Sequence, residues 1–124
     1  GRARVLLVDD EQALAEIGRE LLESLGYKAT ALTDSRQALA LLRERPGEFD
    51  LLITDQNMPG LAGAELAKAA LAGRPDLPVL MLTGFSETMS PEAARAIGIR
   101  ELLLKPVLRR ALAAAIEAAL AEKK

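Results

Sequence analysis

The chain has 124 residues, half of them hydrophobic, and a net charge of −2 with both signs interspersed. That length accommodates one domain with a full core, and the charge gives no basic surface of the kind that nucleic-acid binding needs. The absence of cysteine and histidine excludes disulfides, thiolate or histidine metal sites, and histidine-based acid–base catalysis. No apolar run approaches a membrane span, and we expect a cytoplasmic location.

The first half of the chain alternates between strand and helix patterns. The apolar run at 4–8 (RVLLV) predicts a strand, and the helix that follows it ends at Gly26. The residues of that helix at apolar helical spacing are Leu14, Ile17, Leu21, Leu22 and Leu25. A weakly alternating strand is expected at 28–32, and Asp34 opens a second helix that ends near Pro46.

The second half repeats the pattern. We expect a strand at 50–54, a helix at 61–72, a strand at 79–82, a helix that begins at Ser90 and ends near Gly98, and a strand at 101–104. The last helix, expected at 107–122, carries on one side Leu108, Leu112, Ala115, Ile116, Ala119 and Leu120.

Five strand–helix repeats with short connections predict one doubly wound α/β domain over residues 1–124. Most of the strands are apolar throughout rather than alternating, which is typical of a parallel sheet covered by helices on both faces. The expected architecture is therefore three layers, with the sheet between two layers of helices.

Polar residues follow four of the five expected strands, where each strand ends. They are Asp9, Asp10 and Glu11 after the first, Asp55 after the third, Thr83 after the fourth and Lys105 after the fifth. The carboxyl ends of parallel strands meet at one edge of a sheet, and ligands bind there where the strand order reverses. We expect these side chains to converge on that edge.

The chemistry of this set favours phosphoryl transfer. Asp9, Asp10 and Asp55 supply closely placed carboxylate oxygens, which are the ligands that Mg²⁺ prefers. Lys105 and Thr83 add a cation and a hydroxyl group that can stabilise a transferring phosphoryl group. A carboxylate nucleophile in this setting would form an acyl phosphate.

Each of these residues also has an ordinary structural interpretation. Asp9 and Asp10 can cap the first helix, and Asp55 can be a loop acid after a strand. Thr83 with Gly84 can form a turn, and Lys105 can simply end a strand. The functional interpretation depends on the joint placement of these residues at four strand ends.

Four motifs, VLLVDDE, ITDQNMPG, MLTG and LLLKP, resemble in order and spacing those of receiver domains of two-component response regulators. The resemblance spans essentially the whole chain and implies a flavodoxin-like (βα)5 sheet of order 2-1-3-4-5. It implies that Asp55 accepts a phosphoryl group from phosphohistidine on a partner kinase or phosphotransfer domain. Asp10 matches a direct ligand of Mg²⁺ (or Mn²⁺), Asp9 an acid that reaches the metal through water, and Asn57 a ligand through its backbone carbonyl.

The resemblance also assigns a switch. Thr83 and Lys105 match the pair that contacts the phosphoryl group, Gly84 leaves room beside Thr83, and the Lys105–Pro106 bond is expected to be cis. Two positions depart from the family pattern. Leu102 stands where the aromatic residue of the switch is usual, so any switch is expected to depend on movement of the loop from Thr83 to Met89. Phe85 is bulky and apolar at a position where the family varies, and together with Asn57 it is expected to tune hydrolysis of the acyl phosphate.

The resemblance implies a signalling domain without a conventional substrate, which promotes its own phosphorylation and dephosphorylation. No direct nucleic-acid binding and no membrane insertion are expected, and a homodimer through the fourth helix, last strand and last helix is an option. The start at Gly1 suits an excised segment, and the MLTGFSE stretch resembles receivers attached to hybrid sensor histidine kinases. The chain is therefore expected to be either such an excised receiver or a stand-alone regulator.

Two other functions are considered. An aspartate-nucleophile phosphohydrolase of the haloacid-dehalogenase type would carry a D-x-D pattern after the first strand, whereas this chain has adjacent acids and no room for a substrate cap. A pseudo-receiver that serves only as a docking scaffold would not need the complete acidic set.

Overall fold

The computed structural model describes residues 2–84 and 89–121. Within these residues five strands alternate with five helices along the chain. Their bounds are β1 Arg4–Val8, α1 Gln12–Ser24, β2 Lys28–Leu32, α2 Ser35–Glu44, β3 Leu51–Asp55, α3 Gly63–Gly73, β4 Val79–Thr83, α4 Pro91–Ile97, β5 Glu101–Leu104 and α5 Arg109–Ala121.

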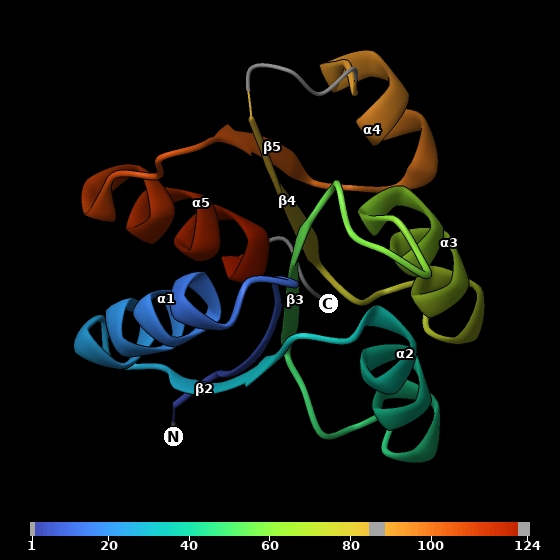
Figure 1. Ribbon diagram of the computed structural model, residues 1–124, viewed down its shortest axis with the longest axis horizontal. Coiled ribbons are helices and arrows are strands. Elements are labelled where there is room, and N and C mark those ends of the chain that lie inside the picture. The colour runs from blue at the N-terminus through green and yellow to red at the C-terminus, as the bar shows by residue number, and fades with distance from the viewer. Residues whose placement is uncertain (1, 85–88, 122–124) are drawn as a thin grey trace.

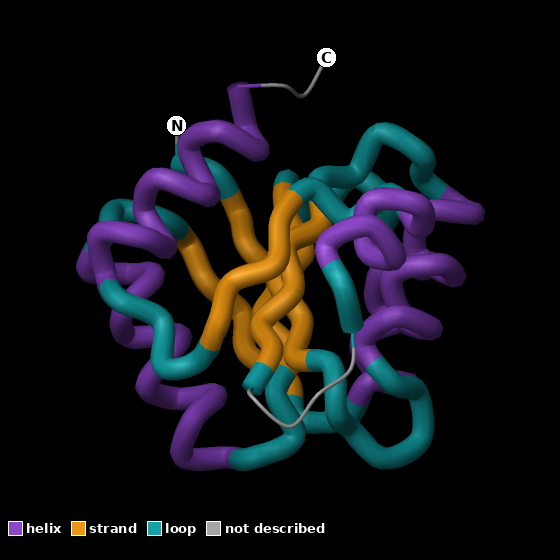
Figure 2. The backbone as a smooth tube through the Cα atoms, turned by 90° about the horizontal axis from the view of Figure 1, so that it is seen from above, coloured by secondary structure: helices purple, strands orange, loops and turns teal. Residues whose placement is uncertain are grey.

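The strands form one parallel sheet in the order β2-β1-β3-β4-β5. Helices α1 and α5 cover one face of the sheet, and α2, α3 and α4 cover the other (Figure 1). Seen from above, the sheet runs through the middle of the molecule with helices on both sides (Figure 2). The expected flavodoxin-like, doubly wound fold is confirmed. Because β1 lies between β2 and β3, the strand order reverses at β1 and β3, and a crevice is expected at their carboxyl ends.

Side-chain alternation along the strands builds two cores. In β1, Leu6 and Val8 pack into the cluster under α2, α3 and α4, whereas Val5 and Leu7 pack into the cluster under α1 and α5. The whole of β3 is buried. The edge strand β2 is only partly buried, which explains its weak apolar pattern, since an edge strand has less surface to cover.

The predicted bounds of β1, β2 and β5 are confirmed, β3 begins and ends one residue later than predicted, and β4 runs one residue further. β3 ends at Asp55 and β4 at Thr83, because both polar residues still pair with a neighbouring strand. Asp55 lies opposite Leu82, and Thr83 lies opposite Leu104. The two residues are therefore the last residues of strands and not the first residues of loops.

Two helices begin later than their apolar residues suggest. The amide of Leu61 donates to the Oγ of Ser35 over 3.1 Å, so that α3 begins at Gly63 rather than at 61. Helix α5 begins at Arg109, and Glu122, at the predicted end, lies outside the described residues. The Ser90 cap is confirmed, because its Oγ accepts from the amide of Ala93 over 3.0 Å.

The apolar side of two predicted helices is not fully buried. Leu14 and Ile17 of α1 are 40% and 59% exposed, and Leu108, which precedes α5, is 72% exposed. These residues lie toward the ends of the helices at the edge of the sheet that carries the polar residues. Among the described residues, no helix combines the length and the apolar character needed to cross a membrane.

Candidate functional site

The sheet places Asp55 at the end of its central strand. Hydrogen bonding of β3 to β1 on one side and to β4 on the other fixes the backbone there. The Asp55 residue is only 4% exposed, so its carboxylate has lost most of its contact with water. A carboxylate in such a position is costly unless it is paired or hydrogen-bonded.

Three of the predicted site residues come together at this edge. Asp9, Asp10 and Asp55 each present one carboxylate oxygen within 4.8 Å of the others. Asp9 is as buried as Asp55, at 4% exposure, whereas Asp10 is exposed. The set combines two carboxylates held by the fold with one that solvent can reach.

The helix-cap interpretation of Asp9 and Asp10 does not hold. The N-cap of α1 is Glu11, whose side chain makes no capping hydrogen bond. The Oδ1 of Asp9 instead accepts from the amide of Glu11 over 3.0 Å, and its own amide donates to the carbonyl of Leu32 over 3.1 Å. These bonds orient the Asp9 carboxylate in the loop and leave Asp10 at the surface.

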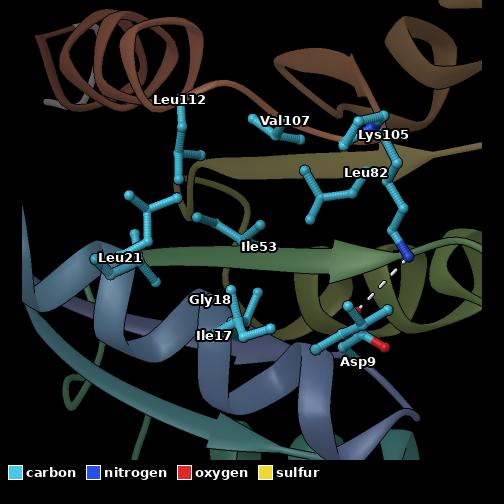
Figure 3. Close-up of a pocket in the computed structure, with 13 residues that line it drawn as sticks. Asp9, Ile17, Gly18, Leu21, Ile53, Leu82, Lys105, Val107 and Leu112 are labelled. Carbon is cyan, nitrogen blue, oxygen red and sulfur yellow. Dashed lines mark ion pairs between the residues drawn. The ribbon is translucent and has the colours of Figure 1, made fainter.

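The side chain of Lys105, in the loop after β5, lies close to two of the acids. Its Nζ lies 3.0 Å from the Oδ2 of Asp55 and 3.6 Å from the Oδ2 of Asp9, and Figure 3 shows the ammonium group reaching from the loop after β5 toward Asp9. The Lys105 amide donates to the carbonyl of Thr83 over 2.7 Å. The Lys105–Pro106 peptide bond is cis, as the resemblance implies.

Burial is the largest influence on the Asp55 carboxyl and raises its pKa above the ordinary value. The hydrogen bond and charge of Lys105 act in the opposite direction, as does the amide of Gln56, while the neighbouring charge of Asp9 raises the pKa further. The net direction is upward. The hydrogen bond and charge of Lys105 therefore do not offset the loss of hydration, and a cation bound beside the carboxylate would favour its ionised form.

Thr83, Gly84 and Asn57 follow or end the neighbouring strands β4 and β3. Thr83 is 7% exposed at the end of β4. A Cβ added at Gly84 would meet no described atom within 4 Å, which agrees with the space expected beside Thr83. Asn57 is exposed in the loop between β3 and α3. Phe85 lies outside the described residues, and so does most of the loop from Thr83 to Met89.

Leu102, where the family pattern places an aromatic residue, is partly buried against the cluster under α2, α3 and α4. It is therefore packed against the core rather than extended into solvent. The aliphatic side chain fills a position on β5 between the core and the surface.

An apolar hollow of about 450 Å³ opens beside the acids. Its floor includes Ile53 and Leu82 of the sheet, and its walls include Ile17 of α1 and Leu112 of α5, as Figure 3 shows. Asp9 and Lys105 also line it. The sequence patterns do not predict this hollow. Helical spacing marks Ile17 as a core residue, whereas in the structure it is 59% exposed and lines the hollow.

The three carboxylates fit a hard divalent cation by their chemistry. They supply only oxygen, they lie close enough to act on one ion, and the exposed position of Asp10 leaves access from solvent. Oxygen-only ligand sets of this kind favour Mg²⁺ or Mn²⁺ over zinc or copper.

A doubly wound α/β sheet with an acidic cluster and a lysine at its carboxyl edge defines the class of this molecule. Comparison with known proteins narrows the class to a family: the profile described as "Response regulator receiver domain" matches residues 5–117. The chain belongs to that family. It is not one of the haloacid-dehalogenase-type phosphohydrolases that the sequence left as an alternative.

Similar proteins come from plants and bacteria. The chain is 40% identical over 105 residues to the two-component response regulator ARR12 of Arabidopsis thaliana, which covers 84% of this chain and 17% of the plant protein. It is 36% identical over 117 residues to the chemotaxis protein CheY of Pseudomonas aeruginosa, which covers 92% of this chain and 93% of CheY. The chain thus spans less than a fifth of the length of the plant regulator and nearly all of CheY.

Solved structures agree with this assignment. A response regulator receiver domain protein from Clostridium thermocellum has a TM-score of 0.91 at 30% identity, covering 96% of this chain and 94% of that one. The chemotaxis protein CheY4 of Vibrio cholerae has a TM-score of 0.83 at 33% identity, covering 97% of this chain and all of that one. Receiver domains are phosphoacceptors in two-component signalling that interact with histidine kinase or phosphotransfer partners, and this chain is a signalling domain of that kind rather than a conventional enzyme.

Proposed function

We propose that Asp55 is the residue of this receiver domain that accepts the phosphoryl group from phosphohistidine on a partner protein. The observation that carries the proposal is the position of Asp55: it is a buried carboxylate at the end of the central strand, with Lys105 Nζ 3.0 Å away and two further carboxylates beside it. No other described residue combines these features.

In the proposed step an oxygen of Asp55 attacks the phosphorus atom of phosphohistidine. A P–O bond forms, the P–N bond breaks, and its electron pair stays on the imidazole of the donor. The product is an acyl phosphate on Asp55. Its later hydrolysis, which this domain promotes itself, returns inorganic phosphate and the free carboxylate.

Asp9, Asp10 and Asp55 would hold Mg²⁺ or Mn²⁺ together with the backbone carbonyl of Asn57. When bound, the ion supplies positive charge that neutralises the acids and the phosphoryl oxygens. The support is the all-oxygen cluster and the burial of Asp55, which raises the pKa of its carboxyl and makes the ionised form costly without a bound cation. In this arrangement Asp9 orients the site from the buried side, and Asp10 binds at the solvent side.

Lys105 and Thr83 are proposed to contact the new phosphoryl group. The Oδ2 of Asp55 that Lys105 now pairs with loses charge when the acyl phosphate forms, so the ammonium is expected to follow the charge to the phosphoryl oxygens. Because the amide of Lys105 is bonded to the carbonyl of Thr83, the ends of β4 and β5 would respond together. This coupling is proposed as the first step of the switch. The aromatic residue that usually takes part in the switch is absent, because Leu102 occupies its position.

The remaining proposals concern the wider assembly. Residues 1–124 are proposed to form a single receiver domain, and a hybrid histidine kinase is proposed as its parent protein. The sequence of the surrounding gene tests this origin. A homodimer through α4, β5 and α5 is supported by Leu104, which is 51% exposed on β5. Direct contact of this domain with nucleic acid is not proposed, since its net charge is −2.

Intact-mass measurement after incubation with acetyl phosphate and Mg²⁺ tests the central proposal. The wild-type chain is expected to gain the mass of one phosphoryl group, and Asp55→Ala is expected to gain none. Asp76→Ala is the matched control, because Asp76 is an exposed carboxylate in the loop before β4, at the opposite edge of the parallel sheet from the cluster. An equal adduct on Asp55→Ala, or none on the wild type, would overturn the proposal.

A further inference from the structure

Gln56 connects the proposed nucleophile to the start of α3. Its amide donates to the Oδ1 of Asp55 over 2.9 Å and to the carbonyl of Leu82 over 3.2 Å. Its carbonyl accepts from the amide of Gly63 over 2.8 Å, and its side-chain Oε1 accepts from the amide of Ala64 over 2.9 Å. One residue therefore holds the carboxylate of Asp55 at one end and the first turn of a helix at the other.

Helix α3 needs this residue because its own N-cap has no acceptor. The first amides of a helix have no partner within the helix, and a serine, threonine, aspartate or asparagine usually provides one. The N-cap here is Ala62, whose methyl group cannot accept a hydrogen bond. Glu65 reaches back to the amide of Ala62 over 3.0 Å, but the next two amides, of Gly63 and Ala64, are bonded to Gln56.

The start of α3 also presses against the backbone of Asp55. A Cβ added at Gly63 would lie 2.2 Å from the carbonyl oxygen of Asp55 and 3.0 Å from the Cα of Gln56. Only glycine permits this approach, so α3 begins in direct contact with the residue that carries the carboxylate. A displacement of the first turn of α3 would therefore move the backbone of Asp55.

We propose that Gln56 is a positioning residue for the Asp55 site. Its side-chain amide fixes the start of α3 and thereby holds the Asp55 carboxylate and the Asn57 carbonyl in the positions needed to bind the metal ion and to accept the phosphoryl group. The inference rests on the proposed function of Asp55. It differs from a purely structural role as a helix cap, because a cap alone would affect the stability of the domain and not the affinity of the site.

Two substitutions at the same helix start separate these roles. Gln56→Met keeps the length of the side chain and removes the acceptor for Ala64. Glu65→Met removes the acceptor for Ala62 at the same helix end, but Glu65 is exposed and, among the described residues, bonds neither Asp55 nor Gln56. Both are expected to lower the melting temperature by a similar amount, because each leaves one first-turn amide without its side-chain acceptor.

The readouts are the Mg²⁺ dissociation constant, from calorimetric titration without a phosphodonor, and the rate of phosphorylation by acetyl phosphate. Gln56→Met is expected to weaken Mg²⁺ binding about tenfold, the size of effect given by loss of a residue that orients a ligand, and to slow phosphorylation. Glu65→Met is expected to leave both unchanged. Gln56→Glu, which retains the acceptor for Ala64, is expected to restore Mg²⁺ affinity to at least the wild-type level.

Equal Mg²⁺ affinities of Gln56→Met and the wild type would overturn the inference, and so would an equal loss in Glu65→Met. Failure of the proposed function is distinguished from these results. A wild-type chain that binds Mg²⁺ but takes no phosphoryl group would contradict the role of Asp55, while the Mg²⁺ titrations would still decide the role of Gln56. A wild-type chain that binds no Mg²⁺ would overturn the inference itself, since there would be no metal site to position.

Discussion

The carboxylate of Asp55 has a partner at each oxygen: the amide of Gln56 at Oδ1 and the ammonium of Lys105 at Oδ2. Burial nevertheless raises its pKa, so these partners do not balance the loss of hydration. The ionised form of Asp55 therefore lowers the stability of the folded domain. Binding of a metal ion, or conversion of the carboxylate to an acyl phosphate, would relieve this cost.

This imbalance predicts that Asp55→Asn stabilises the domain at neutral pH in the presence of a chelator. The pKa of Asp55 in the folded chain is above its ordinary value of 3.8, so the folded state binds more protons than the unfolded state between the two values. The stabilising contribution of Asp55 is complete below 3.8 and is lost as the pH rises through the folded pKa. Asparagine removes the charge and keeps an acceptor for the amide of Gln56.

The measurement is the melting temperature of both chains from pH 4 to pH 8 with EDTA. We expect Asp55→Asn to melt a few degrees higher than the wild type at pH 7, and the difference to shrink toward pH 4. A difference that does not change with pH, or a lower melting temperature for Asp55→Asn at pH 7, would contradict the sign derived from burial.

At the scale of elements, local patterns predicted the strands better than the site. Residue patterns predict β1, β2 and β5 with the bounds that the structure has. The same patterns place Asp55 and Thr83 after their strands because both are polar, whereas both still pair with a neighbouring strand. The role of Gln56 is not predictable from local patterns, because the amides that donate to it, of Gly63 and Ala64, belong to a helix that starts a full loop later. The only local signal is the lack of an acceptor at Ala62, which a search for capping residues would have noticed.

We expect a phosphohistidine-bearing partner to contact helix α1. The donor must reach Asp55, so its surface has to cover the edge of the sheet beside Asp9 and Lys105. The exposed side chains of Leu14 and Ile17 lie there and line the same hollow as those two residues. Contact with the donor would remove these two exposed apolar side chains from water and so favour docking.

Ile17→Ser is accordingly expected to slow phosphoryl transfer from a phosphorylated histidine phosphotransfer domain about tenfold, the change given by about 1.4 kcal/mol of docking free energy. Phosphorylation by acetyl phosphate should be unchanged, because that donor needs no docking surface. Ala72→Ser is the control, since Ala72 is exposed on α3, which covers the opposite face of the sheet from α1 (Figure 1). An equal effect of Ile17→Ser on both donors would show that the residue acts on the Asp55 site and not on docking.

At the scale of the whole molecule, residues from almost the full length of the chain meet at one edge of the sheet. Strand order decides this convergence: β1 and β3 are neighbours, so that Asp9 and Asp55 lie side by side, and β4 and β5 bring Thr83 and Lys105. Periodicity and the rule for parallel sheets predicted that convergence. Distances, the burial of Asp9 and the hollow beside the site could not be predicted, because they depend on how far each helix extends over the sheet.

The same convergence links metal binding to the stability of the entire domain. An ion held by carboxylates from β1 and β3 binds the folded chain and finds no preformed site in the unfolded chain. Mg²⁺ is therefore expected to raise the melting temperature, by an amount that corresponds to about 2.7 kcal/mol when its concentration is about 100 times the dissociation constant. The increase should grow with the logarithm of the Mg²⁺ concentration.

Asp10→Asn tests the origin of this stabilisation by melting curves recorded with and without Mg²⁺. Asp10 is exposed, so its substitution should leave the melting temperature in EDTA nearly unchanged and remove most of the increase caused by Mg²⁺. Glu11→Gln is the matched control, because Glu11 is the next residue, is also exposed and lies outside the carboxylate cluster. If Glu11→Gln lost as much of the increase as Asp10→Asn, the stabilisation would come from general screening of negative charge, and the assignment of Asp10 as a metal ligand would be wrong.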